Sequence, residues 1–289
     1  MDRRGFLKTL GIASGTALCG PLAHASQEPS GQEEFSATVL MDVGLCIGCR
    51  KCETACAEAN GLPVPDSEDK SVFQQHRTTS TTQWTVVNRY STEKGDVFVK
   101  IQCLHCNQPA CASACLVKGL EKTKEGPVLW HEDRCMGCRY CMISCPFDIP
   151  KFEYDKPIPK IQKCIMCWDR LQQGQIPACV EVCPVEALKF GTRRELLESA
   201  RTKIYQNPDS YVPHVYGDHE VGGTGWLYTS PVPFEQLGFK MNLGSTPYPE
   251  FTKEFMYGDP VLQLLWPMLL LGMNKITERK AEVQQRGKE

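Results

Sequence analysis

The sequence predicts an α+β fold in which two similar cysteine-rich modules are followed by an irregular tail and a C-terminal hydrophobic helix. Three observations support this prediction. Sixteen of the 17 cysteines fall into four groups of four. Short β-type runs flank these groups, and helix-forming residues lie within them. Beyond residue 210 the chain becomes rich in Tyr, Pro and Gly, and an apolar run follows near its end.

The third cysteine group has the most specific spacing. Cys135, Cys138, Cys141 and Cys145, followed by Pro146, read C-x2-C-x2-C-x3-C-P, the run that holds [4Fe–4S] clusters in bacterial ferredoxins. In that run the first three thiolates bind one cluster, and the fourth, one helical turn later, ligates a neighbouring cluster. Proline has no N–H to donate and ends the turn. We therefore expect this group to belong to a bacterial-ferredoxin-like module with two [4Fe–4S] clusters.

The other three groups vary this spacing. The first keeps it without the proline, the second widens the middle gap to four residues, and the fourth widens it to eleven and ends in proline. Their members are Cys46, Cys49, Cys52 and Cys56; Cys103, Cys106, Cys111 and Cys115; and Cys164, Cys167, Cys179 and Cys183. Repetition of a motif indicates repeated structural units. Four groups predict two fused modules and four clusters, but their order alone leaves open which groups pair.

Two other uses of the cysteines are possible. Small exported proteins often carry a disulfide framework, and zinc sites use C-x2-C pairs. Zinc pairs usually lie well apart or combine with histidine, which the four-cysteine groups do not match. An exported disulfide- or zinc-stapled binding module is the alternative from another functional class. The net charge of −2 includes no basic excess, so nucleic acid is not an expected partner.

The N-terminus resembles a twin-arginine export signal. Residues 3–8 read Arg-Arg-Gly-Phe-Leu-Lys, a weakly apolar segment follows to residue 23, and residues 23–25 (Ala-His-Ala) offer a cleavage site. We expect residues 1–25 to be a signal peptide and the mature protein to lie in the periplasm. The twin-arginine route exports folded proteins, so clusters can be inserted in the reducing cytoplasm first. An ordinary secretory signal with two arginines is the alternative.

Residue patterns between the cysteine groups predict the local structure. A four-cluster domain is expected over residues 35–191, and a helix with a partner-docking tail over 192–258. Thr192 and Glu195 form a capping box, and Leu196, Ala200 and Ile204 share one face of the helix that it begins. The other expected elements are strands at 35–41, 128–130 and 151–154, a helix at 52–59, a surface insertion at 61–83 and a hairpin from 84–90 to 97–101.

The order of the four groups, with the long gap in the last, resembles the iron–sulfur subunits of the formate dehydrogenase, nitrate reductase and dimethyl sulfoxide reductase family. In that family the inner groups pair with each other, and so do the outer groups. The resemblance implies four [4Fe–4S] clusters, since no group has lost a cysteine. The implied ligands are Cys46, Cys49, Cys52 and Cys183 (set 1); Cys56, Cys164, Cys167 and Cys179 (set 2); Cys103, Cys106, Cys111 and Cys145 (set 3); and Cys115, Cys135, Cys138 and Cys141 (set 4).

The tail supports a narrower resemblance. Residues 212–217, 222–224 and 230–237 resemble the iron–sulfur subunits of membrane-bound hydrogenases and formate dehydrogenases, and the whole chain resembles the ferredoxin-type subunits of hydrogenase-2. This implies a non-catalytic subunit that relays electrons between a nickel–iron hydrogenase and an integral membrane quinone-reactive subunit. The alternative catalytic partner is a molybdopterin oxidoreductase of the formate dehydrogenase or polysulfide reductase type. The sequence shows no nucleophile, base or substrate pocket of its own.

The apolar run at residues 261–273 is short for a membrane span, which needs about 20 apolar residues, and it contains Gln263 and Pro267. Leaving its Trp and Met side chains in water is nevertheless unfavourable, and basic residues follow it, as at the cytoplasmic end of a span. We expect residues 259–276 to anchor the protein in the inner membrane, with a basic tail at 277–289. A helix docked on a membrane partner is the alternative.

Three residues beside cysteines are expected to influence the clusters without binding them. His105, between Cys103 and Cys106, is expected to be a packing or hydrogen-bonding residue. Arg139 is expected to pack near a cluster, and Trp168 to shield one from water.

Overall fold

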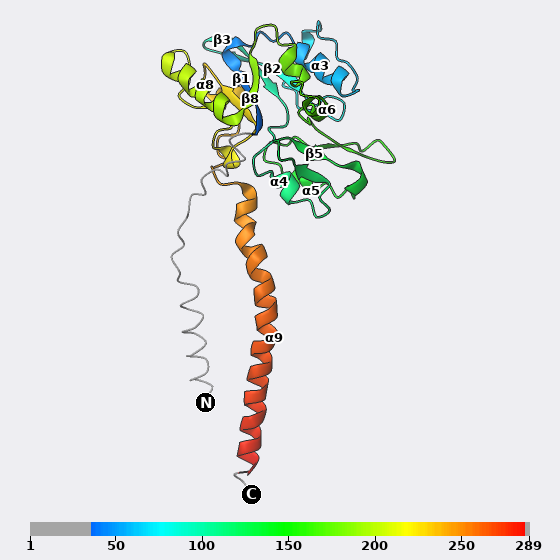
Figure 1. Cartoon of the computed structure of the whole chain (residues 1–289), viewed down its shortest axis with the longest axis vertical. Helices are drawn as coiled ribbons and strands as arrows, with labels where there is room; N and C mark the ends of the chain where they lie inside the picture. Colours follow the sequence, from blue (N-terminus) through cyan, green and yellow to red (C-terminus); the bar gives the residue numbers. More distant parts are fainter. Residues whose placement is uncertain (1–35, 287–289) are drawn as a thin grey trace. The chain divides into compact units, whose positions relative to one another are not determined.

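The computed structural model describes residues 36–286, in which short strands and mostly short helices alternate up to residue 237 and one long helix follows (Figure 1). These residues belong to two units, 36–251 and 252–286. The predicted signal peptide, residues 1–25, lies outside the described residues. Helix and strand are mixed throughout the larger unit, which confirms the α+β prediction.

A three-stranded sheet joins distant parts of the larger unit. β1 (Ala37–Asp42) is its central strand, paired antiparallel with β8 (Leu188–Thr192) and parallel with β9 (Trp226–Thr229). Every residue of β1 after Ala37 is buried. β1 leads into the first cysteine group, β8 follows the last group, and β9 belongs to the tail. The sheet therefore joins these three segments, which are far apart in the sequence. The strand predicted at 35–41 is confirmed as β1.

α8 (Arg193–Gln206) packs against this sheet (Figure 1). The predicted capping box is present, since Thr192 Oγ1 accepts a hydrogen bond from the Glu195 N–H at 3.4 Å and the Glu195 carboxylate accepts one from the Thr192 N–H at 3.3 Å. Leu196 and Ala200 are buried against Leu40 of β1, as the predicted helix face requires. The helix ends at Gln206, before the C-cap residue Asn207.

The tail supplies much of the core on the other face of the sheet. Side chains alternate between the faces of a strand, so Met41 lies opposite to Leu40 and packs among aromatic side chains. The rings of Tyr216 and Phe239 lie 4.6 Å apart, centroid to centroid, in an edge arrangement. The tail is irregular, as expected, but it also contributes β9, which the sequence patterns did not predict.

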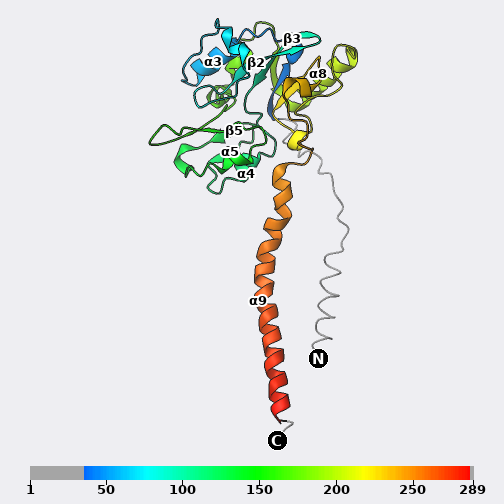
Figure 2. The same ribbon diagram turned by 180° about the vertical axis from the view of Figure 1, so that it is seen from behind.

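Two-stranded ladders and short helices surround the cysteines. The predicted hairpin is confirmed as β2 (Val86–Thr92) and β3 (Gly95–Ile101), and it lies beside α3 (Lys51–Ala59) in both views (Figures 1 and 2). The other ladders are β4 (Leu120–Lys122) with β5 (Val128–Trp130) and β6 (Lys151–Phe152) with β7 (Ile161–Gln162). The remaining short helices are α4 (Ala110–Ser113), α5 (Tyr140–Ser144), α6 (Trp168–Gln172), α7 (Ala178–Glu181), η1 (Val43–Leu45), η2 (Ser71–Gln74), η3 (Glu132–Arg134), η4 (Glu220–Gly222) and η5 (Phe234–Leu237).

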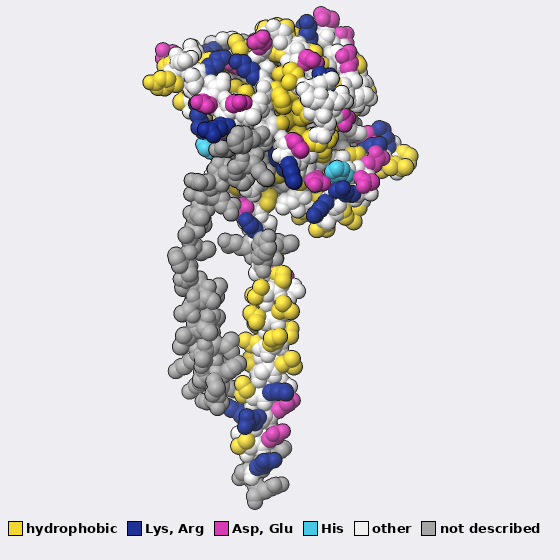
Figure 3. Space-filling model, in the orientation of Figure 1, with side chains coloured by type: hydrophobic (Ala, Val, Ile, Leu, Met, Phe, Trp, Pro, Cys, Tyr) yellow, Lys and Arg dark blue, Asp and Glu magenta, His cyan; other side chains and the backbone are white. Residues whose placement is uncertain are grey.

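The C-terminal helix, α9 (Tyr248–Arg286), is longer than the apolar run that predicted it and contains Pro260 and Pro267. Large apolar side chains are exposed along its middle, including Leu264 at 69 % and Trp266 at 57 %, and charged side chains gather nearer its C-terminal end (Figure 3). Among residues 36–286, no helix combines the length and the apolar character needed to cross a membrane.

Candidate metal centre

The first and third cysteine groups begin with the same backbone conformation. A single 3₁₀ turn, η1 or η3, ends at the first cysteine of each group. The glycine that follows has a positive φ in both, +67° for Gly48 and +72° for Gly137. Arg50 and Arg139, directly after the second cysteine, have the same dihedral angles, φ 62° and ψ 8°. Two loops about 90 residues apart therefore repeat one geometry, as expected for a repeated metal-binding motif.

The short helices show which groups lie together. α3, which carries Cys52 and Cys56 of the first group, packs on α7, which carries Cys179 of the fourth. α4, with Cys111 of the second group, packs on α5, with Cys141 of the third. The outer groups thus lie next to each other, and so do the inner groups. This is the arrangement that the predicted ligand sets require.

Thiols of the first and fourth cysteine groups affect one another's pKa within the predicted sets 1 and 2. Burial raises the pKa of the Cys46 thiol to about 11, and the thiolates of Cys49 and Cys183 contribute to the increase. Burial also raises the pKa of Cys56 well above its usual value, assisted by its set-2 neighbours Cys164, Cys179 and Cys167. Neighbouring thiolates disfavour each other's charge, so these interactions indicate proximity.

Thiols of the second and third cysteine groups affect one another's pKa in the same way, within the predicted sets 3 and 4. Burial raises the pKa of Cys106 well above its usual value, with further contributions from its set-3 neighbours Cys103, Cys145 and Cys111. The pKa of Cys141 is raised to about 11, first by burial and then by the three other thiolates of set 4, which are Cys135, Cys138 and Cys115. The ligand assignment itself stays a prediction.

Some thiols of one set also lie close to thiols of the next set. These contacts arrange the four sets in a linear order. Cys52 of set 1 interacts with Cys179 of set 2. Cys164 of set 2 interacts with Cys103 of set 3, and the two share one buried cluster. Cys111 of set 3 interacts with Cys141 of set 4 and packs with it in another. The predicted sites therefore follow one another in the order 1, 2, 3, 4.

The cysteine side chains supply the kind of donor that [4Fe–4S] clusters require, four thiols for each cluster. All sixteen cysteines among the described residues are free thiols. Within residues 36–286, no group of three or more His, Cys, Asp and Glu side chains has the geometry to hold one metal ion. A zinc ion draws four thiolates to about 2.3 Å from one atom, whereas the four irons of a cubane each bind a separate thiolate, which spaces the sulfurs more widely.

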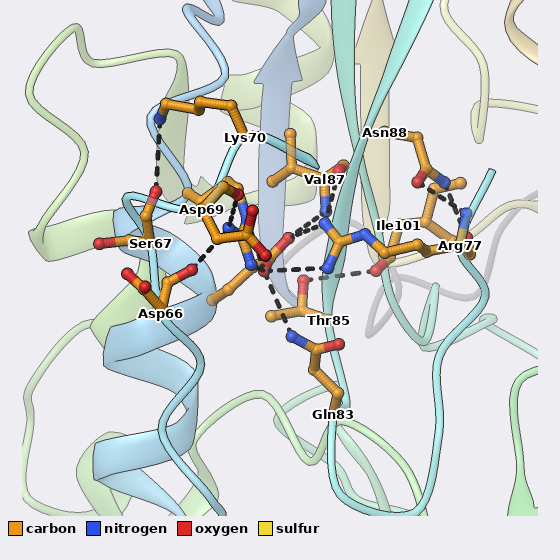
Figure 4. Close-up of polar contacts among 12 residues, drawn as sticks. Asp66, Ser67, Asp69, Lys70, Arg77, Gln83, Thr85, Val87, Asn88 and Ile101 are labelled. Atoms are coloured by element: carbon orange, nitrogen blue, oxygen red, sulfur yellow. Dashed lines mark hydrogen bonds and ion pairs between the residues drawn. The ribbon is translucent and has the colours of Figure 1, made fainter. Parts of the chain in front are cut away.

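Glu53, next to Cys52, anchors the predicted surface insertion to α3. Its buried carboxylate pairs with Arg50 at 2.9 Å and Arg77 at 2.6 Å, and it accepts hydrogen bonds from Gln83 Nε2 at 3.3 Å and the Val87 N–H at 2.6 Å. Figure 4 shows the labelled partners of this group, which come from the insertion and from β2. Sequence reasoning missed this residue, because glutamate in a short helix usually faces solvent.

The three residues expected to influence the clusters lie as follows. His105 is fully buried, and its Nδ1 accepts a hydrogen bond from the Val128 N–H at 2.9 Å, so that Nε2 carries the proton. Burial, followed by Lys163, Lys122 and Lys100, holds its pKa well below the usual value. The Arg139 guanidinium lies 5.6 Å from the ring centroids of Phe152 and Tyr154. Trp168 begins α6 beside Cys167 and is partly buried.

We expect Gly48→Ala to disturb the first cysteine loop far more than Gly137→Ala disturbs the third. Both glycines have a positive φ, which is unfavourable for alanine by about 1–2 kcal/mol. A Cβ on Gly48 would also lie 2.5 Å from the Phe98 ring, whereas a Cβ on Gly137 would meet Phe152 at an ordinary 3.8 Å. Iron content and thermal unfolding of the two variants measure the difference. Equal losses in both would show that the contact with Phe98 is unimportant.

Comparison with known proteins supports the same interpretation. The 4Fe-4S dicluster domain family matches residues 96–193. A protein of Nitratidesulfovibrio vulgaris is 46 % identical over 98 % of this chain and 79 % of its own length. The hydrogenase-2 operon protein HybA of Escherichia coli O157:H7 is 36 % identical over 82 % of this chain and 83 % of its own. The nitrate-inducible formate dehydrogenase iron–sulfur subunit of Escherichia coli K12 is 35 % identical over 69 % of this chain and 70 % of its own.

These relatives confirm the resemblance found in the sequence. HybA and the formate dehydrogenase subunit each match more than two thirds of this chain at over 30 % identity. The matching domain covers residues 96–193 of the cysteine-rich region, and the similarity to the Nitratidesulfovibrio vulgaris protein extends over 98 % of the chain. The chain therefore belongs to the family of ferredoxin-type iron–sulfur proteins that includes the hydrogenase-2 operon protein HybA and the iron–sulfur subunits of formate dehydrogenases.

Proposed function

We propose that the protein is a periplasmic electron-transfer subunit with two ferredoxin-like modules and four [4Fe–4S] clusters, held by ligand sets 1 to 4. The observation that carries the proposal is the row of neighbouring thiol sets from Cys46 to Cys138. When bound, such clusters accept and donate one electron at a time. The residues of this chain bury the sites, exclude water from them and keep successive sites close together.

The two ends of the row differ from its middle in exposure. Cys138 of set 4 is exposed and all four cysteines of set 1 are partly exposed, whereas six of the eight cysteines of sets 2 and 3 are buried. Large apolar side chains are exposed beside both ends, for example Ile47 at 57 % and Ile143 at 81 %. These features support a relay that exchanges electrons with one partner at each end, because exposed apolar surface beside a site favours docking.

We further propose that one partner is the catalytic subunit of a nickel–iron hydrogenase and the other an integral membrane quinone-reactive subunit. The similarity to HybA supports the hydrogenase. A molybdopterin enzyme is the second candidate, favoured by the similarity to formate dehydrogenase iron–sulfur subunits. The twin-arginine motif supports export to the periplasm. The exposed apolar middle of α9 supports membrane attachment, either as an anchor or by docking on the membrane partner.

Metal analysis of the complex, purified anaerobically from its native host through a tag on this chain, tests the proposal. We expect about 16 iron and 16 sulfide per chain, with nickel in the co-purified catalytic subunit. Molybdenum in place of nickel would support the second candidate. A colourless chain with zinc or with disulfides in place of iron would contradict the proposed function altogether.

A further inference from the structure

Among the residues that the structure describes, two lysine side chains are almost completely buried, Lys100 and Lys163, each 2 % exposed. A lysine is rarely buried without an anionic partner, because moving an ammonium group out of water is strongly unfavourable. In the part of the chain that the structure describes, neither lysine forms an ion pair with a carboxylate, although other buried cations such as Arg50 do. The compensating negative charge therefore has to come from another kind of group.

Lys100 is held in place by neutral neighbours. Its Nζ donates a hydrogen bond to Gln102 Oε1 at 2.8 Å and lies 4.3 Å from the centroid of the Trp226 ring. Gln102 Nε2 donates to Tyr228 Oη at 2.7 Å, and Tyr228 Oη donates to the Lys100 carbonyl at 3.1 Å. This closed set of hydrogen bonds fixes the ammonium group at one point in the core.

The anionic neighbours of that point are thiolates of two sets. Lys100 lines one small cavity together with Cys46, Cys49, Cys52 and Cys183, the four cysteines of set 1. The Trp226 ring beside its ammonium group belongs to the same buried cluster as Cys179 of set 2. The ammonium charge also favours the thiolates of Cys56 and Cys164 of that set. The Lys100 charge thus acts on members of both sets at once, in the region where Cys52 approaches Cys179.

Lys163 is the second buried lysine, and it lies farther along the row of thiol sets, next to Cys164. Its Nζ donates hydrogen bonds to the carbonyl oxygens of Val128 and Cys164, both neutral acceptors. Val128, whose carbonyl accepts one of these bonds, packs with Cys111 of set 3 in one buried cluster, and the Lys163 charge favours the Cys111 thiolate.

We propose that Lys100 and Lys163 are fixed counter-charges that raise the reduction potentials of the clusters beside them, Lys100 acting on sets 1 and 2 and Lys163 on set 3. The inference rests on the proposed function. A cluster held by four thiolates carries a net negative charge that increases when it accepts an electron. A nearby fixed positive charge therefore stabilises the reduced form more than the oxidised form.

Redox titrations of the anaerobically purified chain, followed by electron paramagnetic resonance, test the proposal. Lys100→Met keeps most of the side-chain volume and removes the charge. We expect the equilibrium constants for reducing two clusters to fall about tenfold, which corresponds to about 59 mV for a one-electron couple. Lys163→Met should shift a different component by a similar factor. Lys100→Arg keeps the charge and should preserve the potentials, and so should Lys189→Met, which changes an exposed lysine of β8.

Iron content measured on the same samples separates the possible outcomes. Full iron with unchanged potentials in both methionine variants would overturn the proposal and leave the proposed function intact. If Lys100→Met loses iron and Lys100→Arg retains it, the positive charge is needed to hold the clusters, which supports the proposal. Equal iron loss in both would make Lys100 a packing residue and overturn it. An unsubstituted chain without iron would instead contradict the proposed function.

Discussion

Replacing Cys183 by alanine is expected to remove the same cluster as replacing Cys46, although the two residues lie at opposite ends of the cysteine-rich sequence. Each variant should lose about four of 16 irons and the same component of the redox titration. Cys164→Ala should remove a different component, although Cys164 and Cys183 belong to one sequence group. The reason is that α7 turns the last group toward α3, which brings Cys183 to Cys46 and Cys49.

Cys138→Ala provides the matched control for this experiment. Cys138 is exposed and belongs to set 4, at the other end of the row, so its loss should leave the component assigned to Cys46 intact. The pairing would be wrong if Cys183→Ala and Cys164→Ala removed one component while Cys46→Ala removed another. In that case each sequence group would bind a cluster of its own.

Glu53→Gln is expected to destabilise the larger unit by about 3–5 kcal/mol, the usual range for breaking a buried ion pair. The Glu53 side chain has no exposed surface, and the side chains of Arg50 and Arg77 are 2 % and 17 % exposed. An amide of the same shape removes the negative charge and leaves both cations without compensation. The shift in the anaerobic urea unfolding midpoint, followed by circular dichroism, measures this loss.

Glu121→Gln is the control for that comparison. Glu121 pairs with Arg134 at 3.2 Å, but both side chains are about half exposed, so the expected loss is below about 1 kcal/mol. Glu53→Gln should also speed the release of iron in urea, because Cys52 is the adjacent residue of the same helix. If the two variants were equally stable, Glu53 would not be the residue that holds the insertion on α3.

Local spacing predicted much of the candidate site. The cysteine motif predicted a loop followed by a helical turn, and Cys46–Cys56 and Cys135–Cys145 repeat that geometry down to the dihedral angles of Arg50 and Arg139. The capping box at Thr192 also followed from neighbouring residues alone. Such features depend on interactions between residues a few positions apart, so the sequence contains all the information that they require.

Contacts between segments far apart in the sequence could not be predicted from local spacing. No local pattern indicated that Trp226–Thr229 would join the sheet beside β1, because β9 is short and its residues are buried on both faces, without polar alternation. Lys100 lies in a strand of alternating character where lysine usually faces solvent, yet it is buried.

The sequence by itself therefore determined the family, the kind of cofactor and the local structure of the first and third cysteine loops. The family resemblance also implied which cysteine groups pair, and the tertiary structure brings their helices together accordingly. Only the tertiary structure decided where the tail closes the core and which charges are enclosed among the thiols. The physical reason is that spacing along the chain restricts backbone geometry over one or two turns. Contacts between distant segments instead depend on which buried surfaces fit together once those turns have formed.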